Sequence, residues 1–84
     1  MKFTDRAVIS LRDEYSFSKA EWKVLFAIAA NYPHPKNRKL LMESIPQVSY
    51  SRGISALQFL KEIGFVSEDN FQIRFNKMYI EMED

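Results

Sequence analysis

The chain has 84 residues, of which 46% are hydrophobic, 14% are aromatic and 27% are charged, and its net charge is +1. These values are typical of a folded domain rather than a disordered segment, and we expect one domain over residues 1–84. The longest apolar run, residues 24–30, is too short to cross a membrane, and the N-terminus does not resemble a signal peptide. We therefore expect a cytoplasmic protein.

The residue inventory argues against metal sites and enzyme chemistry. There is no cysteine, so disulfides and thiolate ligands are excluded, and the single histidine, His34, has no partner at ligand spacing. The sequence contains no carboxylate pair, nucleophile–base set or glycine-rich phosphate loop. We expect no catalytic residues, no metal, no cofactor and no small-molecule ligand.

Positive charge is concentrated in the middle of the chain. Residues 31–61 contain five Lys and Arg against one Glu, a net charge of +4, while the remainder carries −3. A basic centre is typical of a surface that contacts phosphates, although an ordinary solvated surface explains it about equally well.

The first segment, residues 3–15, fits two interpretations. Phe3, Ala7, Leu11 and Tyr15 recur at four-residue steps, and Thr4 or Asp5 is suited to cap a short helix. Alternating apolar residues between positions 7 and 11 also fit a strand. We favour the helix.

Residues 17–32 predict a long helix. Ser18 and Glu21 have the spacing of a capping box, and Phe17 and Trp22 have that of a hydrophobic staple. An apolar face follows, formed by Trp22, Leu25, Phe26, Ile28 and Ala29. We expect this helix to be core scaffold.

The next two helices are predicted to form a helix-turn-helix. Pro33 and Pro35 end the long helix, and Asn37 or His34 then caps a short helix that Pro46 stops. Ser49 caps the following helix, in which Ile54, Leu57 and Leu60 form an apolar stripe. Gly64 suits its C-terminal end. This pattern indicates a recognition helix with a polar N-terminal end.

The C-terminal part predicts a β-hairpin. A strand over residues 65–67 is followed by a polar turn over residues 68–70 and a second strand over residues 71–75. Alternation predicts that Phe71, Ile73 and Phe75 face inward and that Gln72 and Arg74 face outward. Residues 78–82 are expected to add a third strand or to form a dimer contact.

The order of these elements resembles the winged helix-turn-helix DNA-binding superfamily. Val48, Ser49, Leu60, Gly64 and Val66 fall at the spacing of its recognition helix and first wing strand. The segment FSKAEWKVLFAIA is also similar to the N-terminal domain of lambda-type phage replication O proteins and, more loosely, to plasmid replication initiators. The resemblance implies a mainly α-helical fold with a small β-hairpin (α+β), in which three or four helices precede a two- or three-stranded wing.

Two residue patterns depart from that superfamily. Gly53 stands where an aliphatic core residue is usual; we expect it to permit close approach of the neighbouring helix or to make the recognition helix less rigid. The expected wing tip, Glu68-Asp69-Asn70, is acidic where a DNA-contacting wing is usually basic. We expect this tip to avoid phosphates.

The predicted function is sequence-specific binding of double-stranded DNA, in a small transcriptional regulator or a phage or plasmid replication or partition factor. The helix starting near Ser49 is expected to enter the major groove. The expected base contacts are Tyr50, Ser51, Arg52, Ser55 and Gln58. The expected phosphate contacts are Lys36, Arg38, Lys39, Ser49, Arg74 and Lys77.

Two further possibilities concern partners. A homodimer on a repeated half-site is expected to use Met78, Tyr79, Ile80 and Met82, unless these residues complete the monomer's own sheet. The alternative function is a winged-helix protein-interaction module without DNA binding, which the low net charge and the acidic residues at the hairpin and C-terminus fit.

Overall fold

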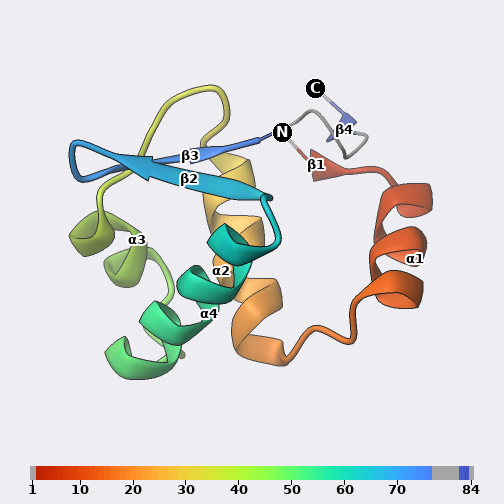
Figure 1. Cartoon of the computed structure of the whole chain (residues 1–84), viewed down its shortest axis with the longest axis horizontal. Coiled ribbons are helices and arrows are strands. Elements are labelled where there is room, and N and C mark those ends of the chain that lie inside the picture. Colours follow the sequence, from red (N-terminus) through yellow and green to blue (C-terminus); the bar gives the residue numbers. More distant parts are fainter. Residues whose placement is uncertain (1, 77–81, 84) are drawn as a thin grey trace.

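The computed structural model describes residues 2–76 and 82–83 of the chain, and it is mainly helical with a small antiparallel hairpin (Figure 1). The expected α+β class is therefore confirmed. The elements are β1 (Lys2–Phe3), α1 (Asp5–Glu14), α2 (Lys19–Ala30), α3 (Arg38–Ser44), α4 (Tyr50–Glu62), β2 (Val66–Asp69), β3 (Gln72–Phe75) and β4 (Met82–Glu83).

Each helix begins at a polar capping residue. The side-chain oxygens of Thr4, Ser18, Asn37 and Ser49 each accept a hydrogen bond from the backbone N–H three residues later, at distances of 2.8–3.4 Å. The Glu21 side chain accepts a hydrogen bond from the Ser18 backbone N–H at 2.7 Å, which completes the capping box. The predicted caps Ser18 and Ser49 are confirmed, and of the alternatives left open the structure has Thr4 rather than Asp5 and Asn37 rather than His34.

The centre of the core lies where α2 packs against α4. Leu25 and Ile28 of α2 and Leu57 and Leu60 of α4 are at most 2% exposed. Leu41 of α3 and Ile73 of β3 are equally inaccessible, so the short helix and the hairpin close the remaining sides of this contact. The predicted staple is confirmed, because the rings of Phe17 and Trp22 meet edge to face with centroids 4.9 Å apart.

Two apolar faces differ in detail from the sequence pattern. The buried side of α4 consists of Gly53, Ala56, Leu57 and Leu60, and Ile54 is only half-buried. Residues 53, 56, 57 and 60 have the i, i+3, i+4, i+7 spacing of one helix face, and that face packs against α2. Residue 54 lies about 100° around the helix from residue 53, at the edge of this face. On α2, Phe26 is 43% exposed and packs at the edge of the core against Phe3 and Trp22.

The hairpin turn also differs from the prediction. Strand β2 continues through Glu68 and Asp69, and the turn consists of Asn70 and Phe71, both with positive φ. Phe71 is 85% exposed, so its predicted inward orientation is wrong, whereas Ile73 and Phe75 are buried as expected. A two-residue turn with positive φ matches the strand twist, and it removes Phe71 from the alternation of β3.

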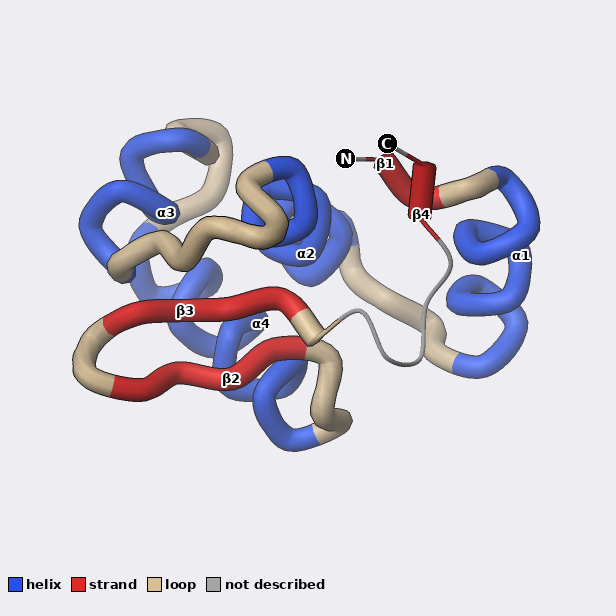
Figure 2. The backbone as a smooth tube through the Cα atoms, turned by 90° about the horizontal axis from the view of Figure 1, so that it is seen from above, coloured by secondary structure: helices blue, strands red, loops and turns tan. Residues whose placement is uncertain are grey.

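A single bridge joins the hairpin to the segment before α3. Lys36 and Ile73 exchange two backbone hydrogen bonds, of 2.9 and 2.7 Å. The hairpin turn and α3 consequently lie along the same side of the molecule in both Figure 1 and Figure 2.

The two ends of the chain meet on the other side. β1 pairs antiparallel with β4, with Phe3 opposite Met82. The helix favoured for the first segment is confirmed as α1, which buries Ala7 and Leu11. Met78, Tyr79 and Ile80, predicted for a dimer contact, lie outside the described residues, as does Lys77; the backbone of Met82 pairs within its own chain.

Gly53 gives a test of the α3–α4 contact. A Cβ at this position would overlap Sδ of Met42 and lie 3.0 Å from its Cε. In a Met42→Ala background we expect Gly53→Ala to raise the free energy of unfolding by about 1 kcal/mol, because alanine is the better helix former. In the wild-type background the gain should be smaller, since the Met42 side chain must move.

Urea unfolding of the four proteins measures this coupling. An identical gain in both backgrounds would mean that Met42 does not occupy the space beside Gly53.

Candidate nucleic-acid interface

The first turns of α4 present a polar surface. Tyr50 is 62% exposed, and the other predicted base-contact residues, Ser51, Arg52, Ser55 and Gln58, are exposed as well. Ser51, Ser55 and Gln58 share the face opposite the buried stripe, because they are spaced four and three residues apart. Among the described residues, none bonds to the side chains of Ser51, Arg52, Ser55 or Gln58 through a hydrogen bond or ion pair.

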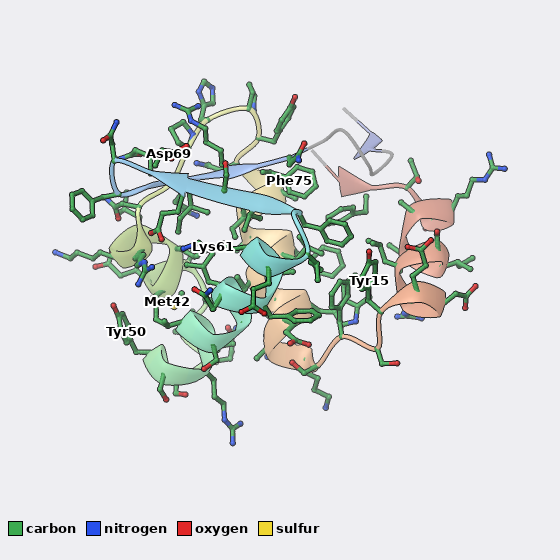
Figure 3. The ribbon with its side chains drawn as sticks, in the orientation of Figure 1. Tyr15, Met42, Tyr50, Lys61, Asp69 and Phe75 are labelled. Atoms are coloured by element: carbon green, nitrogen blue, oxygen red, sulfur yellow. The ribbon has the colours of Figure 1, made fainter. Side chains whose placement is uncertain are left out.

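One hollow beside this surface lies between α3 and the start of α4. Lys39 from α3 and Tyr50 from α4 line it, over a floor that includes Met42 and Val48. Figure 3 shows Tyr50 at the beginning of α4 and Met42 between the two helices. The turn of the helix pair thus brings two predicted phosphate contacts, Arg38 and Lys39, to the same hollow as the predicted base contact Tyr50.

A second hollow lies between α4 and the start of α2. Its walls include Ser51, Arg52 and Ser55 from α4 and Lys19 and Glu21 from α2. Lys19 was not among the predicted contacts, and no sequence signal marks it, because its position beside Arg52 depends on how α2 packs against α4.

The predicted phosphate contacts are not equivalent in the structure. Lys39 and Arg74 are exposed, and no described residue forms an ion pair with either side chain. Lys36 is half-buried at the bridge to β3. The Ser49 hydroxyl oxygen accepts from the Arg52 backbone N–H, so only its hydrogen is left to donate to a phosphate.

Arg38, in contrast, is held by Glu68. Its Nε and Nη2 donate to the two carboxylate oxygens of Glu68 at 2.7 Å each, a bidentate pair. Lys61 Nζ donates to the same carboxylate at 3.2 Å. Glu68 therefore links α3, α4 and β2, and it pairs with two of the five basic residues counted in the middle of the chain.

The electrostatics of Glu68 follow from this geometry. The Glu68 side chain is only 10% exposed, whereas that of Arg38 is 41% exposed. The hydrogen bonds from Arg38, and secondarily those from Lys61, lower the pKa of the Glu68 carboxyl from its ordinary 4.5 to about 2, although burial acts in the opposite direction. The pKa of Arg38 is raised by the same pairing.

The position of Glu68 corrects the view of an acidic hairpin tip. Of the two acidic residues in the expected turn Glu68-Asp69-Asn70, Glu68 faces the helices and only Asp69 faces solvent. Alternation continued from Val66 would have placed Glu68 on the inner face, but its charge made a turn the simpler interpretation.

The described residues offer neither a metal site nor a membrane-spanning helix. No group of three or more His, Cys, Asp or Glu side chains lies close enough to hold a metal ion. Likewise, no helix in this part of the chain has the length and apolarity needed to cross a membrane.

Comparison with known proteins adds no family to these observations. No protein-family model, no curated protein and no solved structure matches the chain.

Glu68→Gln tests the role of the ion cluster. At neutral pH we expect the free energy of unfolding to fall by about 1–2 kcal/mol, since the charged hydrogen bonds are weakened but the partners remain partly exposed. The folded pKa is below the unfolded one, so this stabilisation is complete above about pH 4.5 and is lost as the pH falls toward 2.

Urea unfolding of both proteins between neutral pH and about pH 2 measures the difference. The matched control is Asp69→Asn, the exposed neighbour, which should change stability by less than about 0.5 kcal/mol. A wild-type advantage that does not shrink in acid would contradict the assignment.

Proposed function

We propose that the chain is a sequence-specific double-stranded DNA-binding protein of the winged helix-turn-helix class, with α4 as the recognition helix. The observation that carries the proposal is the polar face of α4. Ser51, Arg52, Ser55 and Gln58 are exposed at the helix that follows a short turn after α3, and their side chains bond to nothing in the described chain. Hydroxyl, guanidinium and amide groups on such a helix are those that contact base edges in the major groove.

The chain order supports the same class. The helix α2, the bridge at Lys36, the pair α3 and α4, and the hairpin β2–β3 follow one another as the elements of a winged domain do. In this arrangement α2 supports the recognition helix from behind, and the hairpin lies beside it.

The free cations provide the expected phosphate contacts. Lys39 lines a hollow at the start of α4 and Lys19 lines the hollow that Arg52 also lines, while Arg74 lies on the exposed face of the hairpin. Arg38 contributes less, because Glu68 binds its guanidinium. A regulator of transcription, or a phage or plasmid replication or partition factor, would use such a module, and a second copy on a repeated half-site would enlarge its small interface.

The alternative is a protein-interaction module without DNA binding. The pairing of Arg38 and Lys61 with Glu68 favours it, because it lowers the positive charge available to phosphates. The two functions differ in salt dependence: retention on a DNA column that disappears at moderate salt supports DNA binding.

Matched variants test base contacts against phosphate contacts. After selection of bound duplexes from a random pool, we expect Arg52→Ala to lose about 1–3 kcal/mol of binding free energy on the selected duplex and less on a scrambled one. We expect Lys39→Ala to weaken binding to both equally and to lower the slope of log affinity against log salt by roughly 1.

Fluorescence titration at two salt concentrations measures both effects. The control is Arg12→Ala, which removes the same charge from α1, on the side of the molecule away from α3 and the hairpin turn (Figures 1 and 2). Equal losses on both duplexes for Arg52→Ala would contradict base recognition, and a wild-type protein that retains no duplex would contradict the proposed function.

A further inference from the structure

The most exposed large apolar side chain that the structure describes is Phe71, at the hairpin turn. It is 85% exposed, and its φ is 63°, in the left-handed region. Glycine is the usual residue at this place in a two-residue turn, because a side chain is strained there. Both the left-handed backbone conformation and the exposed apolar side chain of Phe71 are therefore unfavourable for the stability of the turn.

The hairpin holds Phe71 rigidly away from the core. β2 and β3 pair through four residues on each side, with Asp69 opposite Gln72 directly below the turn. The bridge between Lys36 and Ile73 fixes β3 to the segment that leads into α3. The aromatic ring is thus presented by a braced element rather than by a loose loop.

The chain neighbours of Phe71 are polar. Asn70 and Gln72 flank it in sequence, and Asp69 and Arg74 lie on the exposed face of the strands below it. A protein-binding surface would be expected to surround such a residue with further apolar area. Proteins that bind the minor groove combine amide or basic side chains, which contact base edges, with an apolar side chain that separates a base step, and Phe71 between Asn70 and Gln72 offers both kinds of group.

The hairpin turn also lies on the same side of the molecule as α3 and the start of α4 (Figures 1 and 3). Figure 3 shows Asp69 beside the turn and Tyr50 at the start of α4, with α3 between the two elements. With α4 in the major groove, the groove next to it along the duplex is the minor groove.

We propose that Phe71 is a wedge that inserts between adjacent base pairs of the minor groove beside the site bound by α4, while Asn70 and Gln72 contact the base edges. This inference rests on the proposed DNA-binding function and adds to it a deformation of the DNA. Flexible pyrimidine–purine steps would be the favoured insertion points, because they are unstacked most easily.

The test uses the duplex recovered by selection, with 2-aminopurine placed at successive positions and with dyes on both ends. Wild-type protein should increase 2-aminopurine fluorescence at one step and shorten the end-to-end distance. Phe71→Gly should bind the same duplex roughly tenfold or more weakly, with neither signal, because the stacking contact is lost. Phe71→Leu should keep both signals, since leucine also serves as a wedge.

Two controls separate folding and nonspecific effects. Glycine suits the backbone at position 71, so Phe71→Gly should melt at the same temperature as the wild type or higher. Ile9→Ala removes another exposed apolar side chain, on α1, and should leave affinity and both signals unchanged.

The outcomes distinguish this inference from the function on which it rests. If the wild type binds the duplex and Phe71→Gly binds it equally well, or if no step responds to the wild type, the wedge is overturned while DNA binding stands. If the wild type binds no duplex, both proposals fail.

Discussion

The contact between α2 and α4 is the constraint on which the proposed interface depends. Leu25 and Ile28 meet Leu57 and Leu60 in the most inaccessible part of the core, so the rotation of α4 about its axis is fixed by burial. Because one side of α4 is buried against α2, the helix geometry places residues 51, 55 and 58 on the side that points away from the core. The surface of the proposed interface is therefore a consequence of packing on the opposite side of the same helix.

A second constraint, the ion cluster at Glu68, sets the position of the hairpin. One carboxylate binds Arg38 of α3, thirty residues away, and Lys61 of α4, seven residues away, so three elements share a polar contact at the rim of the core. The same contact pairs two of the basic side chains in the middle of the chain with a carboxylate. A net charge of +4 over residues 31–61 includes both of these cations, and the charge free to meet phosphates is smaller.

The sequence predicted those features that depend on neighbouring residues. The four helix caps, the staple and the exposed start of α4 each follow from a pattern shorter than one or two helical turns. Contacts between distant segments could not be predicted in this way, and Lys19 beside Arg52 and Arg38 with Glu68 are examples. Phe71 was misplaced because Asn70-Phe71 lacks the glycine that usually identifies a two-residue turn.

The scarcity of free cations bears on how such a module would obtain specificity. Nonspecific binding to DNA depends on the number of phosphates neutralised, so a protein with a net charge of +1 gains little from that source. If the proposed function holds, a larger share of the binding free energy would come from base contacts by α4 and from deformation of the duplex. Both terms depend on sequence, whereas phosphate contacts do not. Pairing Arg38 with Glu68 would thus lower affinity for all DNA and raise the ratio of specific to nonspecific binding.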